Sequence, residues 1–230
     1  MLMGNKPMGT IAYMGGVHSV HELFCWSISQ MVQYNAEYLA APGQCVHYDH
    51  AQVSYHAYAR NSLAERMRGD WLLMLDTDHS FDPDLAARMV HRMIRYNLDV
   101  LVGIYLYRNP PHFPVLYRWN PEGEGSYEVI GSWDGDPKVF EVGSAGAGCL
   151  LVRRSVFDRI RLELGESPFD ISPPFSEDHS FFNRLRKLEI KAYCDPTIEC
   201  NHLAVKSLSL KDYDSSEIQL SPKHAVAGFS

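Results

Sequence analysis

The stretch Trp71-Leu72-Leu73-Met74-Leu75-Asp76-Thr77-Asp78 places five apolar residues directly before two carboxylates that are separated by one residue. An apolar run of this length predicts a β-strand covered on both faces, as in a parallel sheet between layers of helices. In open α/β sheets, ligands bind at the carboxyl ends of the strands. We therefore expect Asp76 and Asp78 to lie at the ligand-binding edge of an α/β sheet.

The spacing of these two acids indicates a divalent cation. In extended backbone, residues i and i+2 point to the same side, so Asp76 and Asp78 can both address one ion while Thr77 points elsewhere. Carboxylate oxygens suit Mg2+ or Mn2+, which keep coordination positions for water and for the phosphates of a substrate. A polar turn without a ligand is the structural alternative, because short acidic pairs also occur by chance.

Hydrophobic periodicity on both sides of this stretch predicts alternating helices and strands, and hence a parallel or mixed sheet sandwiched by helices. Residues 107–142, rich in proline, glycine and aromatic side chains, predict short strands and loops. Asp82 is expected to cap the helix that follows the two acids, with Pro83 in its first position. The other strands are expected at 9–14, within 36–48, at 100–106 and at 149–152. The helices are expected at about 20–34, 55–68, 83–96, 155–161 and 176–188.

The composition is that of a globular protein. With 230 residues, 46% hydrophobic and 21% charged, the chain can build one domain with its own core, which we place at residues 1–205, followed by a peripheral tail at 206–230. No apolar run approaches the roughly 20 residues of a membrane span, and the first residues lack the apolar segment of a signal peptide, so a cytoplasmic protein is expected. The five cysteines contain no Cys-X-X-Cys pair, which argues against a zinc cluster or a disulfide framework.

Two later segments also indicate a site. Gly143-Ser144-Ala145-Gly146-Ala147-Gly148 predicts backbone that passes close to a ligand or to another element. Glu177 and Asp178 stand at a predicted helix N-terminus, where the helix dipole and free amides favour carboxylates, so capping alone is a sufficient explanation for either acid.

The order of these pieces resembles nucleotide-sugar-dependent glycosyltransferases of the GT-A fold, especially the family-2-like group. The resemblance covers residues 9–202 and implies a Rossmann-type mixed, mainly parallel sheet flanked by helices. It implies an enzyme that moves a hexose or pentose from a nucleotide sugar, with a UDP-sugar favoured. The pieces that carry it are Ala59-Arg60-Asn61, Asp76-Thr77-Asp78, the glycine-rich segment, Glu177-Asp178 and His202.

The resemblance also implies roles for single residues. Asp78 would hold Mn2+ or Mg2+, Asp76 would reach the ribose or a water on the ion, and His202 would complete the coordination. Asp178 would be the general base of an inverting reaction, although retention stays open because the same fold supports both outcomes. The donor would be bound by Arg60, Asn61, Asp76, Thr77, Gly146, Ala147 and Glu177.

The chain departs from the family pattern in two places. His79 follows Asp78 directly and competes with His202 as the third ligand, since imidazole accepts Mn2+ more readily than Mg2+. His179 and Ser180 stand where apolar or acidic residues are more common, which puts the acceptor side in doubt. A glycan, a protein, a lipid and a modified DNA base all remain as acceptors.

Two other functions stay open at this level. The stretch around Asp76 also resembles the nucleophile motif of haloacid-dehalogenase-like phosphatases, although that family has Thr or Val where Ser80 stands here and carries the motif near the start of its fold. The other alternative is a sugar- or nucleotide-binding module that has lost turnover. Release of phosphate from a model phosphoester without any sugar donor would indicate the phosphatase.

Overall fold

The computed structural model describes residues 6–15, 20–52, 55–120, 122, 126–133, 139–173 and 175–204. The expected tail at 206–230 lies outside the described residues. The helices are α1 (Glu22–Tyr34), α2 (His56–Arg66), α3 (Leu85–Arg95), α4 (Arg154–Arg159) and α5 (Glu177–Lys187), with π-helical turns at Asn35–Leu39 and Ile160–Leu164. The strands are β1 (Lys6–Gly15), β2 (Gln44–Gln52), β3 (Trp71–Asp76), β4 (His79–Phe81), β5 (Val100–Ile104), β6 (Leu116–Asn120), β7 (Ser126–Val129), β8 (Phe140–Val142), β9 (Ser144–Ala145), β10 (Cys149–Arg153) and β11 (Ala192–His202).

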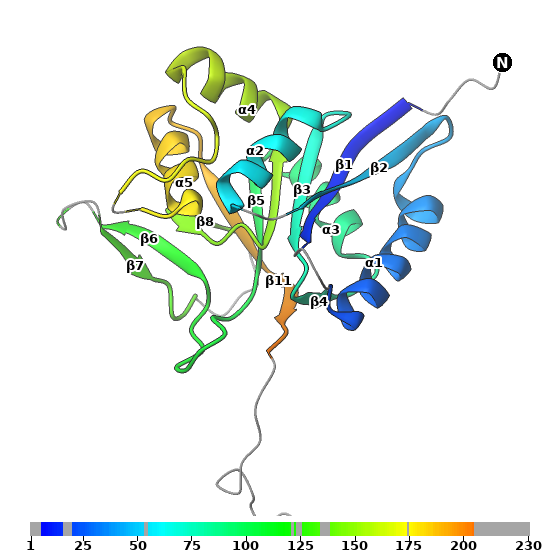
Figure 1. Cartoon of the computed structure of the whole chain (residues 1–230), viewed down its shortest axis with the longest axis horizontal. Helices are drawn as coiled ribbons and strands as arrows, with labels where there is room; N and C mark the ends of the chain where they lie inside the picture. Colours follow the sequence, from blue (N-terminus) through cyan, green and yellow to red (C-terminus); the bar gives the residue numbers. More distant parts are fainter. Residues whose placement is uncertain are drawn as a thin grey trace, which may run out of the picture.

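The central sheet is mixed and mainly parallel, which confirms the expected fold class (Figure 1). Its strand order is β2-β1-β3-β10-β5-β11-β4, with β8 also paired to β11. β2, β1 and β3 are parallel, and β10 is inserted antiparallel between β3 and β5. The start of β10 therefore lies at the same sheet edge as the end of β3, with Cys149 opposite Leu75.

Helices cover both faces of this sheet, as the apolar run of β3 predicted. Leu72 and Met74 belong to the core shared with α2, α4 and α5, whereas Leu73 and Leu75 belong to the core shared with α1 and α3. Successive strand residues point to opposite faces, so only a strand buried on both sides is apolar at every position. In Figure 1, α1 and α3 lie on one side of the sheet and α2, α4 and α5 on the other.

Two expected boundaries are wrong. Asp84, not Asp82, is the N-cap residue of α3, and it makes no side-chain capping bond. The carbonyl of Asp82 instead accepts a 3.2 Å bond from the N–H of Leu85, so Pro83 belongs to a turn that precedes the helix. The strand expected within 36–48 begins only at Gln44 and runs to Gln52, because a π-helical turn extends α1 as far as Leu39.

Periodicity did not indicate β11 and β4, the two strands at one end of the strand order of the central sheet. β11 is an 11-residue strand that pairs first with β5 and then, after a shift in register between Cys194 and Glu199, antiparallel with β4. Pro196 lies in that irregular part, where a missing backbone N–H costs no ladder bond. A three-residue strand such as β4 is too short to show a period.

A second sheet of three strands, in the order β7-β6-β9, packs beside α5. The Tyr127 hydroxyl donates a 2.7 Å hydrogen bond to Asn183 of α5. Ser144 of β9 lies 2.7 Å from Nδ1 of His179, whose ring stacks on Tyr127. These contacts give His179 an anchoring role between the small sheet and α5.

Among the described residues, the helices all fall short of the length and apolar character that crossing a bilayer requires.

Candidate active site

The end of β3 and the segment before β10 meet at the carboxyl edge of the sheet. The N–H of Asp76 donates a 3.0 Å bond to the carbonyl of Gly148. A Cβ atom at position 148 would lie 2.5 Å from Cε1 of His79 and 2.9 Å from Oδ2 of Asp76. Glycine is therefore required at 148, because any side chain there would displace two polar residues of this edge.

A buried arginine joins three carboxylates beside this edge. Arg60 of α2 is 2% exposed and donates a 3.0 Å hydrogen bond to the carbonyl of Ala147. Its guanidinium nitrogens lie 3.4 Å from Asp76, 3.5 Å from Asp178 and 3.9 Å from Glu177. We call these four charged side chains the Arg60 network. Burial opposes the charge of Arg60, but the three carboxylates outweigh it and raise the pKa of the guanidinium.

Asp178 combines a reactive pKa with a partly open position. Ser176 caps α5 by accepting a bond from the N–H of His179, which places Glu177 and Asp178 in the first turn. Burial raises the pKa of Asp178 from 3.8 to about 6, although Arg60 and the backbone N–H of Ala147 act in the opposite direction. The side chain keeps 23% of its surface exposed, whereas its Oδ1 atom is buried, accepts no hydrogen bond within the described part of the chain and lies 3.5 Å from Nε of Arg60.

A second group of side chains lies beyond the end of β3. Asp78, His79 and His202 each place one ligand atom within 4.8 Å of the others, and we call them the cation group. Nε2 of His202 lies 3.3 Å from Oδ2 of Asp78. Nδ1 of His202 is 2.8 Å from the carbonyl of Leu106, and Nδ1 of His79 is 3.0 Å from the carbonyl of Gly148. Burial lowers the pKa of His79, against the opposing effect of nearby carboxylates.

The residues of this edge fit a divalent cation. Four carboxylates, from the Arg60 network and Asp78, are matched by only two arginines in the described contacts, Arg60 and Arg108. Arg108 contacts both Asp78 and Nε2 of His202, so the structure already places a positive group against two members of the cation group. Carboxylate and imidazole together suit Mn2+ and similar ions. The surplus of negative charge gives an ion a favourable place.

The structure brings together most of the site residues expected from the sequence, with Asn61 as an exception. Its side chain accepts a 2.9 Å bond from the N–H of Phe169 and donates a 2.6 Å bond to the carbonyl of the same residue. Both polar ends of the amide are thereby occupied, so Asn61 anchors the loop before α5. Thr77 is also tied to the fold, since its hydroxyl donates to the carbonyl of Met14 at 3.0 Å.

The glycine-rich segment approaches other parts of the protein. Gly146 and Ala147 are both buried. A Cβ at Gly146 would lie 2.0 Å from the hydroxyl oxygen of Tyr105, and one at Gly143 would lie 2.3 Å from the backbone nitrogen of Trp119. These two glycines thus permit close packing of protein against protein, while Ala147 contributes backbone groups that hold Arg60 and Asp178.

Sequence reasoning left out two residues of the site. Tyr105 is 9% exposed, its hydroxyl accepts a 3.3 Å bond from the N–H of Gly148, and its ring lies 4.5 Å from that of His79. Its position at the end of an expected strand was the signal that places it at this edge. Arg108 carries no such signal, because it lies in a loop that comes to the cation group only through tertiary packing.

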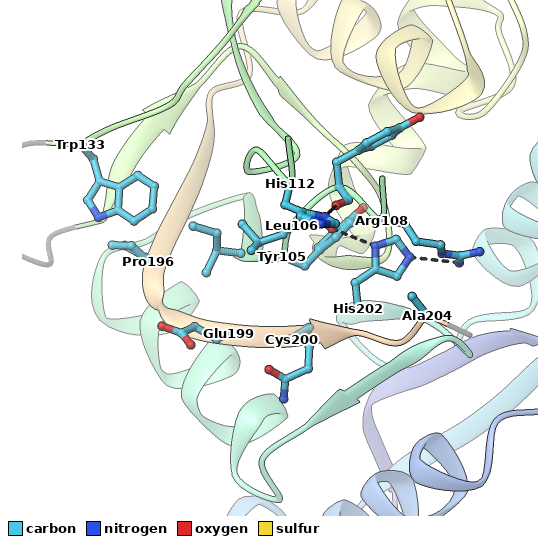
Figure 2. A pocket seen from close by; sticks show the side chains of 13 residues that line it. Tyr105, Leu106, Arg108, His112, Trp133, Pro196, Glu199, Cys200, His202 and Ala204 are labelled. Atoms are coloured by element: carbon cyan, nitrogen blue, oxygen red, sulfur yellow. Dashed lines mark hydrogen bonds between the residues drawn. The ribbon is translucent and has the colours of Figure 1, made fainter. Parts of the chain in front are cut away.

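A cavity of about 480 Å³ adjoins the cation group (Figure 2). It is lined by the end of β5, the loop that follows and the last part of β11. Figure 2 shows Trp133 at one end and Arg108 with Ala204 at the other, with His202 bonded to both Leu106 and Arg108. Asp178 is not among its described lining residues, so this cavity is distinct from the surroundings of that carboxylate.

Comparisons with known proteins agree with this architecture. The crystal structure of A197 from STIV has a TM-score of 0.54 and 16% identity over 85% of this chain and 86% of that chain. GalNAc-T7, solved with UDP, GalNAc and Mn2+, has a TM-score of 0.58 and 11% identity over 98% of this chain. The chain spans only 46% of that protein's length, and likeness at these identities shows the fold alone. No curated protein matches the sequence.

The sequence itself matches a family over more than half of its length. Residues 29–161 match the family described as Glycosyl transferase family 2. This confirms the resemblance and the GT-A-like fold drawn from the motifs, and it supports a glycosyl transfer function. The chain belongs to glycosyl transferase family 2.

Proposed function

We propose that the protein is a metal-dependent glycosyltransferase that moves a hexose or pentose from a nucleoside-diphosphate sugar to an acceptor hydroxyl, with inversion. Asp178 is the general base. The observation that carries the proposal is the state of this carboxylate, which has a pKa of about 6 and a side chain that is still 23% exposed beside Arg60. It lies on the same sheet edge as a group of side chains suited to a cation.

The base fits its task because its pKa lies just below neutral pH. At pH 7 a carboxyl group with a pKa of about 6 is mostly ionised, yet it holds a proton far better than an ordinary aspartate. Asp178 takes the proton of the acceptor hydroxyl while that oxygen bonds to the anomeric carbon. The bond from this carbon to the diphosphate breaks on the opposite face, which inverts the configuration.

Asp78 and His202 would hold Mn2+ or Mg2+, with Asp76 beside them. When bound, such an ion acts as a Lewis acid that neutralises the charge of the departing nucleoside diphosphate. We favour a UDP-sugar and Mn2+, since GalNAc-T7, a protein of similar fold, was solved with UDP, GalNAc and Mn2+.

The donor-binding role is proposed for the partly exposed carboxylates Asp76 and Glu177, whose side chains are 29% and 15% exposed. Arg60 is too deeply buried to clamp a diphosphate, so we give it the task of holding the three carboxylates in place. Gly146 and Ala147 support the donor site through their backbone. Asn61 is not retained as a donor ligand.

The catalytic domain in this proposal spans residues 1–205, because the elements that build the site lie between Lys6 and His202. The proposal also includes a cytoplasmic location. The buried cysteines Cys149, Cys194 and Cys200 are thiols, as expected in a reducing compartment.

The test is release of nucleoside diphosphate from a panel of UDP- and GDP-sugars in the presence of Mn2+. We expect slow release in water, faster release with a suitable acceptor, and none with EDTA. Asp178→Asn and Asp78→Ala should each abolish transfer, whereas Asp158→Asn, an exposed carboxylate on α4, should not. Equal release in EDTA would refute the metal requirement.

The same measurements separate the alternatives. A non-catalytic module would gain thermal stability from a nucleotide sugar without releasing nucleoside diphosphate. A phosphatase would release phosphate from a model phosphoester with no sugar donor present, and it would lose that release in Asp76→Asn.

A further inference from the structure

We propose that His79 binds the metal directly, together with Asp78 and His202, and that this site with two imidazoles prefers Mn2+ to Mg2+. The inference rests on the proposed function of the same site, but it concerns a ligand outside the expected pair. It also replaces the choice between His79 and His202 with a site that uses both.

Strand pairing is the first support. β4 and β11 are antiparallel, and His79 lies directly opposite His202 in their register. Residues directly opposite in such a pair carry their side chains on the same face, with Cβ atoms about 5 Å apart. The two rings accordingly lie edge to face with centroids 5.0 Å apart. A residue that follows Asp78 by one position is thus brought to the same spot as one far away in the chain.

The hydrogen bonds of the two rings are the second support. Each Nδ1 faces a backbone carbonyl, that of Gly148 for His79 and that of Leu106 for His202. A carbonyl can only accept, so both Nδ1 atoms carry the proton and both Nε2 atoms keep a lone pair. This is the arrangement by which proteins orient metal-binding histidines. The ligand atoms of both residues lie within 4.8 Å of that of Asp78.

The space around His79 is the third support. Its side chain is buried with 1% exposure, and Gly148 leaves room for the ring only because it lacks a Cβ, which would lie 2.5 Å from Cε1. A purely structural histidine would be explained by the bond to Gly148 and by packing on Tyr105. That explanation does not account for the directly opposed histidine or for the nearby carboxylate.

The preference for Mn2+ follows from the ligands. Mg2+ demands oxygen ligands and dehydrates reluctantly, while imidazole nitrogen is accepted by Mn2+ and more strongly by later transition metals. A site with two nitrogens and one carboxylate should therefore bind Mn2+ without a donor present. A site with one nitrogen would depend more on the substrate's phosphates.

The experiment uses the full chain with Mn2+ alone. Calorimetric titration gives the Kd, and electron spin echo modulation of bound Mn2+ counts the coordinated imidazole nitrogens. We expect two imidazoles in the unaltered protein. In His79→Asn the amide nitrogen replaces Nδ1 and preserves the bond to Gly148, so we expect one imidazole and a Kd for Mn2+ weakened by about tenfold or more.

Two further variants sharpen the test. His79→Gln offers an oxygen in place of the nitrogen Nε2. It should therefore reduce the preference for Mn2+, so that the Kd for Mg2+ comes closer to the Kd for Mn2+. His112→Asn is the matched control, because His112 also bonds a backbone carbonyl through Nδ1 but lies outside the cation group. It should leave both the Kd and the imidazole count unchanged.

The outcomes separate this inference from the proposed function. One imidazole in the unaltered protein, or an unchanged Kd in folded His79→Asn, overturns the role of His79 even if transfer is metal-dependent. Two imidazoles without any release of nucleoside diphosphate uphold the metal site and refute the transferase. No binding of Mn2+, with or without UDP, overturns both. The count in the unaltered protein decides the matter even if a variant fails to fold.

Discussion

Replacing Asp178 with asparagine should abolish transfer and at the same time stabilise the fold at alkaline pH. The pKa of this carboxyl group is raised from 3.8 to about 6, with burial as the main cause. The folded protein therefore holds a negative charge in surroundings that disfavour it. Active sites commonly contain such destabilised charges, because catalysis needs groups with shifted pKa values. Asparagine has nearly the same shape as the protonated acid and carries no charge.

The magnitude follows from the two pKa values. At 1.36 kcal/mol for each pH unit, their difference corresponds to about 3 kcal/mol of destabilisation at pH 8. The side chain is 23% exposed, so solvent screens part of this effect and we expect a gain of about 1–3 kcal/mol for Asp178→Asn. Because the pKa of this acid is higher in the folded than in the unfolded protein, its ionisation lowers the free energy of unfolding as pH rises. The penalty is complete above about pH 6 and fades as pH falls towards 3.8.

The assay is urea unfolding of the unaltered protein and the variant at pH 8 and pH 4.5, in EDTA so that bound metal does not contribute. Asp195→Asn is the control. Burial would raise the pKa of Asp195, but hydrogen bonds from Thr197 and Arg92 outweigh it and lower the pKa. This second variant should therefore lose stability at pH 8, where Asp178→Asn gains it.

Loss of stability in Asp178→Asn at pH 8 would refute the reasoning, as would a gain of the same size at both pH values. Retained transfer with an intact fold would refute the role of Asp178 as base. The expected result is a gain at pH 8 that falls to about a third of its size at pH 4.5, together with lost turnover.

Three further predictions concern the same edge of the sheet. The kcat/KM of transfer should fall about tenfold per pH unit below about pH 6, because Asp178 must be ionised to accept a proton; a profile flat down to pH 5 contradicts this. Gly148→Ala should weaken Mn2+ binding and transfer at least about tenfold, since the added Cβ lies 2.5 Å from a histidine ring atom and 2.9 Å from a carboxylate oxygen. Gly131→Ala, with nothing within 4 Å, should have no effect in the same titration. Arg108→Ala should tighten Mn2+ binding in the absence of donor, because the guanidinium competes with the ion for the cation group. Arg118→Ala is the control and should leave the Kd for Mn2+ unchanged. Equal Kd values for Arg108→Ala and the unaltered protein would show that Arg108 does not compete.

Local sequence patterns predict much of this fold. The apolar run of β3 required cover on both faces, and the structure buries alternate residues in two cores. The two acids after it lie at the carboxyl edge, where parallel strands present ligand sites. The motif order led to the correct family because each motif is short and contiguous. Periodicity encodes which side of an element is buried, and that information lies within a few neighbouring residues.

The remaining features depend on contacts between distant parts of the chain. His79 meets His202 only because β4 pairs with β11, and β4 is too short for a periodic signal. Arg60 has the pattern of an ordinary helix arginine until α5 brings two carboxylates to it. Asn61, one residue later, is committed to the backbone of Phe169 instead of a ligand. Local sequence states which residues can take part in chemistry, but their charge states and partners are set by burial and by long-range packing.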